Sequence, residues 1–457
     1  MNSTVQHQRK RFRSGKTSSL KARRAALDRL RTLIESKQEQ ILEALHDDLG
    51  KGKVEAYVSE VAFVLGEIRH ARKRLKRWMK PQKRRTPLSL WRAKSTVHAE
   101  PLGVSLILGP WNYPFQLLMV PLVSALAAGN TAVLKPSEFA PRTAELMARL
   151  LREAFDEDQV AVVTGDAEVA KGLLSERFDK IFFTGGSDIG REVMKAAARY
   201  LTPVTLELGG KSPCIVAGDT DLQVAARRIT WGKFLNAGQT CVAPDHVWVK
   251  RGKGDALIQL LREEIAEFYE GNSKASEDYS RIVNERHFDR LMAMLDGTEP
   301  EIGGRHDREQ LHIEPTVVRL DTPDHLLMEE EIFGPILPVI EYDSIAEVVE
   351  YQEGRSPLAL YLFSDDDLLT QRVLSEIRSG GVCINDTLSH LLNRELPFGG
   401  LGESGMGACH GKAGFDAFSH QRAVMKRKLS PDPKFRYPPI KVGLGKLKKI
   451  LRFFGEG

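Results

Sequence analysis

Between Gly103 and Gly210, short apolar runs alternate with stretches of helical spacing, and this alternation constrains the fold more than any other feature. Glycine or proline stands at most of the junctions. The pattern predicts strands at 104–108, 131–134, 160–163, 180–183 and 204–206, and helices at 115–128, 143–154 and 191–200. Strands that alternate with helices indicate an α/β chain with a parallel sheet of Rossmann type, which binds ligands outside the carboxyl ends of its strands.

The alternation starts again later in the chain. A helix at 256–269 and strand-like segments at 316–318 and 357–363 indicate a second α/β domain. Ahead of the first strand, helical spacing covers 20–45 and 54–78, and residues 81–101 are expected to be irregular or extended. A length of 457 residues fits two or three domains.

Composition narrows the class of protein. Hydrophobic residues make up 42% of the chain, charged residues 28%, and the net charge of +5 is small for this length, so we expect a soluble protein without a nucleic-acid partner. The four cysteines are scattered, which predicts no disulfide framework, no metal site and a reducing cytoplasm: Cys214, Cys241, Cys383 and Cys409. The N-terminus lacks the apolar core of a signal peptide, and the apolar stretch 120–128 is too short to span a bilayer.

The turn Gly238-Gln239-Thr240-Cys241 is the first candidate for chemistry. It follows a helical pattern over 222–235 and precedes a strand at 247–249, so the cysteine is expected at a helix-to-strand turn, where reactive groups are often displayed. A free cysteine is also commonly a small buried hydrophobe, and the turn alone leaves both interpretations open.

Two further residues have side chains suited to acyl chemistry. Asn112 is at the centre of a rigid turn, Gly109 to Pro114, where its amide would donate to a developing oxyanion or stabilise its own turn. Glu207 ends an apolar strand, where burial would raise its pKa and fit it for base work. The alternative for Glu207 is an ion pair with a neighbour such as Lys211.

Other strand ends offer polar or glycine-rich turns. Lys135 and Glu138 follow one strand and could hold ribose hydroxyls or form an ordinary surface turn. Gly185 to Gly190 joins a strand to a helix, but its spacing is not that of a dinucleotide GxGxxG motif. Its glycines would still let a phosphate or nicotinamide approach a helix N-terminus, although tight turns use glycine for other reasons as well.

Taken together, these segments resemble the aldehyde dehydrogenase superfamily from about Ser19 to Tyr437. The class 3 branch, which includes fatty and aromatic aldehyde dehydrogenases, is matched by Ser356 to Tyr361, Asn385-Asp386, Phe418 to Arg422 and Arg436 to Pro439. Gly186 departs from the family, which usually has Ser or Asn there, so a side-chain contact at this position is not expected.

The resemblance implies roles for these residues. Cys241 is expected to be the nucleophile, Glu207 the general base and Asn112 an oxyanion donor. The cofactor, NAD or NADP, is expected to contact Trp111, Lys135, Glu138, Gly185, Gly186, Ser187, Gly190, Leu208, Glu331 and Phe333. Lys135 and Glu138 would hold the adenosine ribose, and Glu331 and Phe333 the nicotinamide ribose and ring.

The family fold implies a division of the chain. A Rossmann-type cofactor domain is expected at 1–79 and 102–207, an α/β catalytic domain at 208–416, and a β oligomerisation arm at 80–101 and 417–435. The expected reaction oxidises an aldehyde, of medium or long aliphatic chain or aromatic, to a carboxylic acid through a thiohemiacetal and a thioester. The alternatives are a CoA-acylating aldehyde dehydrogenase, against which Glu207 argues, and an inactive binding protein on the same fold, against which Cys241 and Asn112 argue.

The resemblance also implies a homodimer acting on a small-molecule aldehyde. The basic cluster from Arg72 to Arg85 is expected to be a solvated helix end, where cations suit the helix dipole. Residues 436–457 form a basic tail in which Leu444, Leu447, Leu451 and Phe454 share one helical face. Such a tail would lie on an anionic membrane surface, pack over the entrance to a substrate pocket or dock on the body of the dimer. The membrane surface is the leading expectation, so we expect a cytoplasmic enzyme that is peripheral at the inner membrane.

Overall fold

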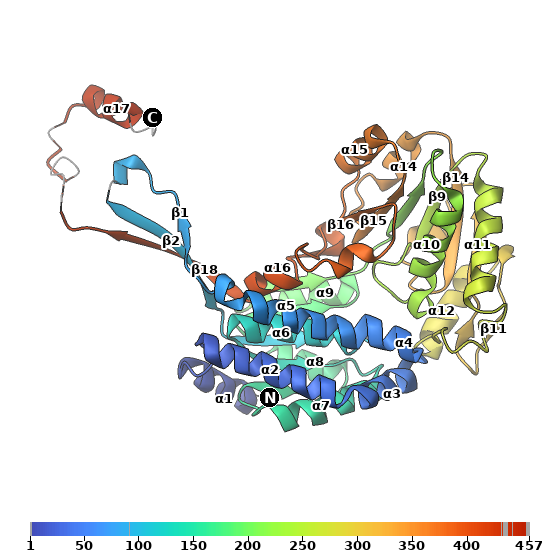
Figure 1. The fold of residues 1–457 in the computed structure, drawn as a ribbon, viewed down its shortest axis with the longest axis horizontal. Coiled ribbons are helices and arrows are strands. Elements are labelled where there is room, and N and C mark those ends of the chain that lie inside the picture. The colour runs from blue at the N-terminus through green and yellow to red at the C-terminus, as the bar shows by residue number, and fades with distance from the viewer. Residues whose placement is uncertain (1, 91, 431, 433–436, 441, 454–457) are drawn as a thin grey trace.

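The structure is a computed structural model that describes residues 2–90, 92–430, 432, 437–440 and 442–453 (Figure 1). Two α/β bodies lie side by side, and a narrow arm extends from one of them. In the described part of the chain, the bodies contain a six-stranded and a seven-stranded sheet, and the arm contains a three-stranded sheet.

The six-stranded sheet has the order β17-β7-β6-β3-β4-β5 and is parallel except for β17. Its strands are β3 (Val104–Leu108), β4 (Thr131–Lys135), β5 (Val160–Val162), β6 (Lys180–Thr184), β7 (Val204–Glu207) and β17 (Gly405–Met406). Strand β17 reaches this sheet from far along the sequence and pairs antiparallel with the end of β7. The carboxyl end of β7 is therefore covered by a late segment of the chain.

Helices cover both faces of this sheet. One core contains α2 (Leu20–Ser36), α3 (Gln38–Leu49), α5 (Phe63–Trp78), α6 (Gln116–Ala128), α7 (Pro141–Ala154) and α16 (Gly411–Ala417); the other contains α1 (Asn2–Arg13), α8 (Ala167–Leu174) and α9 (Ser187–Ala198). Side chains alternate between the faces along a strand, so Ile107 joins the first core whereas Leu106 and Leu108 join the second. Burial on both faces explains why these strands read as continuous apolar runs.

The seven-stranded sheet has the order β10-β13-β14-β9-β8-β15-β16, and only β10 runs antiparallel to its neighbour. Its strands are β8 (Pro213–Val216), β9 (His246–Lys250), β10 (Pro300–Ile302), β13 (Thr316–Leu320), β14 (Ile336–Tyr342), β15 (Ala359–Phe363) and β16 (Gly381–Ile384). The accompanying helices are α10 (Leu222–Phe234), α11 (Gly254–Phe268), α12 (Glu285–Leu295), α13 (Leu326–Glu329), α14 (Ile345–Gln352) and α15 (Asp367–Glu376). Short elements complete this body: η3 (Leu235–Gly238), β11 (His306–Asp307), β12 (His312–Ile313) and η4 (Ser389–Leu392). The short helix η5 (Gly402–Ser404) leads into β17 and contacts α9 through Glu403.

The arm combines segments from both ends of the sequence. Strands β1 (Gln82–Arg84), β2 (Ala93–Pro101) and β18 (Ser419–Arg427) form one antiparallel sheet, with η2 (Leu88–Leu90) between the first two. Helix α17 (Leu444–Phe453) lies near the tip of the arm, away from both bodies (Figure 1). Among the described residues, no helix combines the length and the apolar character needed to cross a membrane.

Two expectations about local structure change. The single helix predicted over 20–45 is wrong, because the chain breaks at Lys37, whose N–H bonds back to Leu33 and Ile34 while α3 starts afresh. The helix predicted over 54–78 begins as α4 (Lys53–Ala56) and passes through a π-helical turn, η1 (Tyr57–Ala62), before α5. Later in the chain, β17 pairs with β7 and α16 packs on α5 and α6, so residues 405–417 lie on the first body.

Candidate active site

Cys241 lies in a tightly held loop between α10 and β9. The loop passes through left-handed backbone at Asn236, Ala237 and Gly238, with φ values of 54°, 50° and 75°. A Cβ at Gly238 would lie 2.2 Å from the carbonyl oxygen of Gly334, so only glycine fits there. The side chain of Gln239 donates to the carbonyls of Asn236 and Arg281 and accepts from the N–H of Val283. Strained backbone held by so many contacts is typical of a functional turn.

The thiol of Cys241 is held in its neutral form by its surroundings. Burial raises its pKa to about 12, and the nearby carboxylates of Glu331 and Glu207 act in the same direction. A thiol is a poor nucleophile compared with a thiolate, so the sulfur must lose its proton as it attacks.

Asn112 lies beside this loop, on the turn that leads into α6. Its side-chain amide donates to the backbone carbonyl of Gln239 over 3.0 Å, so it does not merely stabilise its own turn. Its backbone carbonyl accepts from the ammonium of Lys51 and from the side-chain amide of Asn236, both at 2.9 Å. Asn112 is therefore fixed from both bodies.

The Lys51 ammonium belongs to a fully buried ion pair with Glu60, at 2.5 Å, from the π-helical turn η1. The second carboxylate oxygen of Glu60 accepts the N–H groups of Phe115 and Gln116 at 2.9 Å each, which caps the start of α6. This pair positions the turn that carries Asn112, and it was not predicted, because Lys51 lies in a glycine turn between two predicted helices and Glu60 in an ordinary helical pattern.

Glu207 ends β7 and is buried, with 3% of its surface exposed. Burial raises its pKa well above the usual range, while Cys409 and Lys180 act in the opposite direction. The alternative pairing with Lys211 is wrong, because Lys211 forms a buried ion pair with Asp245 and donates to the carbonyls of Leu327 and Glu330. Neither oxygen of Glu207 has a hydrogen-bond partner at contact distance among the described residues.

One cavity brings most of the predicted site residues together. Its walls include Trp111, Asn112, Gly185, Gly186, Glu207, Leu208, Cys241, Glu331 and Phe333. A Cβ at Gly186 would meet nothing within 4 Å, so the first turn of α9 opens directly onto free space. The ring of Phe333 packs edge-on against Trp111, with centroids 5.3 Å apart. A glycine-lined helix N-terminus facing a cavity is suited to the phosphates of a dinucleotide.

The remaining predicted cofactor residues lie around this cavity and do not line it. Lys135 and Glu138 pair with one another at 2.5 Å at the carboxyl end of β4. Ser187 lines an adjoining pocket that shares Gly209 and Glu331 with the first. A Cβ at Gly190 would lie 2.7 Å from Leu208, so this glycine serves close packing.

Residues that the sequence did not reveal also shape the cavity. His287 and Arg290 reach it from α12, and the ring of His287 lies 5.0 Å from that of Trp111. Arg290 donates to the carbonyls of Glu331 and Ile332. Burial raises the pKa of Glu331 to about 8, with the charge of Asp245 adding to the effect. No motif marks α12, and only its packing shows its part in the site.

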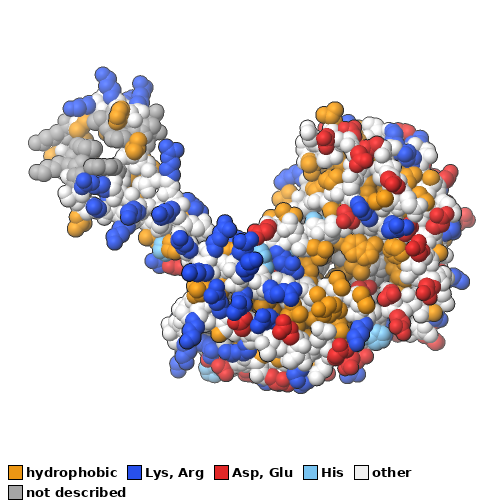
Figure 2. All heavy atoms as spheres, in the orientation of Figure 1, with side chains coloured by type: hydrophobic (Ala, Val, Ile, Leu, Met, Phe, Trp, Pro, Cys, Tyr) orange, Lys and Arg blue, Asp and Glu red, His pale blue; other side chains and the backbone are white. Residues whose placement is uncertain are grey.

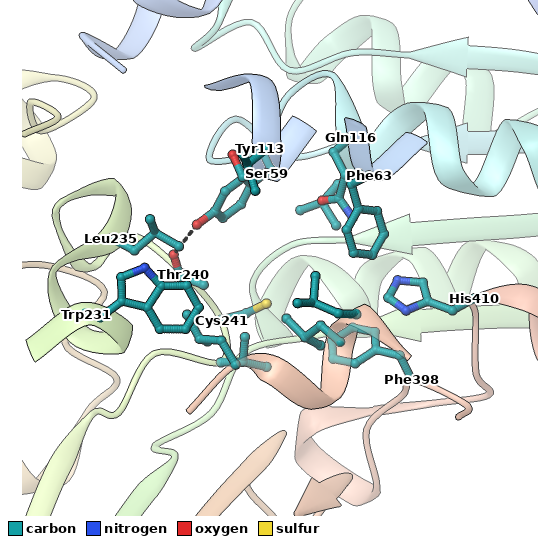
Figure 3. Close-up of a pocket in the computed structure, with 16 residues that line it drawn as sticks. Ser59, Phe63, Tyr113, Gln116, Trp231, Leu235, Thr240, Cys241, Phe398 and His410 are labelled. Atoms are coloured by element: carbon teal, nitrogen blue, oxygen red, sulfur yellow. Dashed lines mark hydrogen bonds between the residues drawn. The ribbon is translucent and has the colours of Figure 1, made fainter. Parts of the chain in front are cut away.

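A second cavity opens on the other side of Cys241 and is almost entirely apolar (Figure 3). Its lining includes Val58, Phe63, Leu117, Trp231, Leu235, Leu388, Leu391, Leu392 and Phe398. Two of its polar side chains carry no charge. The Tyr113 hydroxyl forms a hydrogen bond with the Thr240 hydroxyl at 2.7 Å. Burial lowers the pKa of His410 to about 3, so its ring is neutral. Cys241 thus stands between an apolar space and a more polar, glycine-lined one.

Comparisons with known proteins agree with this geometry. A model of the aldehyde dehydrogenase family matches residues 1–424. The 4,4'-diaponeurosporen-aldehyde dehydrogenase of Staphylococcus aureus is 46% identical over 97% of this chain and 96% of that protein. Aldehyde dehydrogenase family 3 member A2 of Rattus norvegicus is 45% identical over 96% of this chain and 91% of that protein.

Solved structures give the same result. The substrate-bound state of Staphylococcus aureus AldH superposes with a TM-score of 0.96 at 45% identity and covers 99% of both chains. An NAD-dependent aldehyde dehydrogenase from Sinorhizobium meliloti gives a TM-score of 0.85 at 30% identity, covering 94% of this chain and 88% of that one. The class 3 resemblance and the predicted α/β fold are confirmed, and the chain belongs to the aldehyde dehydrogenase family.

Proposed function

We propose that this enzyme oxidises an apolar aldehyde to a carboxylic acid with NAD or NADP, using Cys241 as nucleophile, Asn112 as oxyanion donor and Glu207 as general base. The observation that carries the proposal is that Cys241 lines both the apolar cavity and the glycine-lined one. A sulfur in that place can hold a substrate carbon while a hydride acceptor lies opposite.

The steps follow from the groups around the sulfur. Cys241 releases its thiol proton to solvent and attacks the aldehyde carbon, which forms a thiohemiacetal anion whose oxyanion the Asn112 amide and the Cys241 backbone N–H stabilise. Glu331 and Phe333 would hold a nicotinamide in the glycine-lined cavity, where it would supply the acceptor for the hydride that the thiohemiacetal carbon loses as the thioester forms on Cys241. Glu207, as carboxylate, then takes a proton from water, which attacks the thioester and releases the acid.

The residues around the glycine-lined cavity support a dinucleotide cofactor. The open backbone at Gly186 and the start of α9 suit its phosphates, and Phe333 and Glu331 suit the nicotinamide half. Glu138 disfavours a 2′-phosphate, but its ion pair with Lys135 weakens that effect. Relatives point both ways, since one Bacillus cereus structure is an NAD+ complex and a rat relative is named dimeric and NADP-preferring.

The apolar lining supports medium- or long-chain aliphatic, or aromatic, aldehydes. Burial of each methylene contributes about 0.8 kcal/mol, so an apolar cavity favours longer chains steeply until its length is filled. A CoA-acylating reaction is disfavoured because Glu207 is present and buried beside the sulfur.

We further propose a homodimer assembled through the arm, and contact of the tail with an anionic membrane surface. Residues 68–99 hold 12 Lys and Arg and no Asp or Glu, and residues 420–457 hold 11 Lys and Arg against two Asp and Glu. The rest of the chain holds 43 Lys and Arg against 59 Asp and Glu. Positive charge is thus concentrated on the end of α5, the arm and α17, as Figure 2 shows.

Helix α17 adds apolar groups to this basic region. Leu444 and Phe453 are 66% and 83% exposed, whereas Phe454, which was expected on the same face, lies outside the described residues. Basic side chains with exposed apolar ones favour a lipid headgroup region over a nucleic acid. The proposed division of the chain keeps a cofactor body, a catalytic body and this arm with its tail.

A screen of the purified enzyme tests the proposed reaction. Short, long and aromatic aldehydes are offered with NAD+ or NADP+, and formation of the reduced cofactor is followed by absorbance. Turnover that rises from short to long or aromatic aldehydes, with release of the free acid, supports the proposal. Product that requires CoA, or a preference for short polar aldehydes, refutes it.

A further inference from the structure

Lys180, at the start of β6, is a buried lysine that the proposed reaction does not use. Only 3% of its surface is exposed, and its ammonium donates to the hydroxyl of Thr205 at 2.7 Å. Among the described residues, no carboxylate lies within ion-pair distance of it. Lysines are rarely buried without such a partner, because the charged form loses its hydration.

The sheet register places this lysine behind Glu207. Strands β6 and β7 are parallel, with Phe182 beside Thr205 and Thr184 beside Glu207. Because side chains alternate along a strand, Lys180, Thr205 and Glu207 share the face that packs against α6 and α16. Thr205 is the residue that precedes Glu207 on the same face of β7, so its hydroxyl holds the ammonium next to the carboxylate along that face.

This face is closed from above by the returning chain. A Cβ at Gly407 would lie 2.9 Å from the Thr205 hydroxyl, so the backbone of that segment packs directly on it. Ser105, which pairs in register with Lys180 on β3, has a buried hydroxyl without a hydrogen-bond partner in the described part of the chain. The lysine and the glutamate thus share a small polar region that is shielded from solvent.

Few other charges act in this region. The pKa of Glu207 is lowered by Lys180 and by the Cys409 thiol. Glu207 in turn raises the pKa of Cys241 and that of Lys180. Burial lowers the pKa of Lys180 to about 7, and the charge of Glu207 opposes that effect. Burial raises the pKa of Glu207, and the charge of Lys180 opposes that effect.

We propose that Lys180 is a positioning residue for the general base: held by Thr205, its ammonium favours the carboxylate form of Glu207 and so sets the pH above which the thioester is hydrolysed. This inference rests on the proposed role of Glu207. A buried carboxyl is a base only in its ionised fraction, and each unit of pKa changes that fraction about tenfold at lower pH. An opposite charge close by lowers a carboxyl pKa by about 1–3 units.

The test is the pH dependence of kcat, measured with saturating aldehyde and NAD+ over the range in which the protein stays folded. Lys180→Met removes the charge. We expect the pH at which kcat reaches half of its plateau on the acid side of the profile, the acid limb, to rise by about one pH unit or more. Thr205→Val keeps both charges but frees the ammonium, so a smaller shift in the same direction is expected. Lys195→Met, which removes an exposed charge on α9 that pairs with Glu192, is the matched control and should leave the limb in place.

A second background separates this inference from the proposed function. If Lys180 acts through Glu207, Lys180→Met should not change the residual rate in Glu207→Gln. Rapid-mixing bursts of reduced cofactor add a readout that a merely structural role would not move: the burst rate should be unaltered in Lys180→Met, and only the steady rate should fall at low pH.

The outcomes are distinct. A limb that stays in place in Lys180→Met and Thr205→Val, while Glu207→Gln stalls hydrolysis, overturns the role of Lys180 and leaves the proposed function intact. A Glu207→Gln enzyme that turns over normally overturns both. Should Lys180→Met fail to fold, the Thr205→Val shift decides alone.

Discussion

The buried pair of Lys51 and Glu60 offers a sharp test of how the site is held. In Glu60→Gln the shape of the side chain is kept, and its oxygen can still accept the N–H groups of Phe115 and Gln116. Its amide, however, would then face the Lys51 ammonium, so two donors meet where an ion pair of 2.5 Å existed. Breaking a buried pair in this way typically costs about 3–5 kcal/mol of folding free energy.

A second effect is expected on catalysis. The Lys51 ammonium also donates to the backbone carbonyl of Asn112, so its displacement moves the proposed oxyanion donor. Loss of a whole oxyanion donor costs about 10²–10³ in kcat, and a displaced donor should cost part of that, about tenfold to a hundredfold, with little change in KM.

Urea unfolding and steady-state kinetics measure the two effects. The matched control is Glu168→Gln, which breaks an exposed pair with Lys171 at 2.7 Å and should change the free energy of unfolding by less than about 1 kcal/mol. The double variant Lys51→Met with Glu60→Gln should recover much of the lost stability but not the lost kcat. Equal stability losses in Glu60→Gln and Glu168→Gln would refute the reasoning, as would a change confined to KM.

Four further predictions concern the reaction and the tail. Cys241→Ser should abolish aldehyde oxidation and leave cofactor binding by fluorescence titration unchanged; a tenth of the wild-type kcat would rule out its role as nucleophile. Glu207→Gln should give a stoichiometric burst of reduced cofactor followed by slow turnover, and in the unmutated enzyme kcat should rise with pH, because burial raises the pKa of Glu207 and the protonated form is inactive as a base. Asn112→Ala should lower kcat by about 10²–10³ with KM little changed. Truncation after Tyr437 should keep short-aldehyde activity and weaken co-sedimentation with anionic vesicles, and unaltered vesicle binding and chain-length preference would make the tail structural packing.

Much of the six-stranded body was predictable because its signals are local. Strands buried on both faces read as apolar runs, and β3, β4 and β6 were predicted to within one or two residues. One boundary was missed at Lys37, where the helix stops without a glycine or proline to mark its end.

The candidate site divides in the same way. Asn112 follows β3 and Glu207 ends β7, so a parallel sheet places both at one edge. That Cys241, from the other sheet, would join them in one cavity was implied only by the family resemblance. The groups that hold them were not predictable, because their partners are distant in sequence: Glu60 contacts residue 115, Lys211 contacts Asp245, and Lys180 contacts Thr205. A single charged side chain in a helix, strand or turn gives no sign of the distant segment that it contacts.

The position of Cys241 between two cavities also bears on how such an enzyme can diversify. The two linings share Leu117 and Cys241, and are otherwise built from different residues. Side chains such as Trp231 and Leu392 can therefore be exchanged over generations without touching the wall that faces the dinucleotide. Related enzymes can therefore differ in the aldehydes that they accept and keep the same redox chemistry. Laboratory evolution of substrate range should succeed soonest at residues of the apolar cavity.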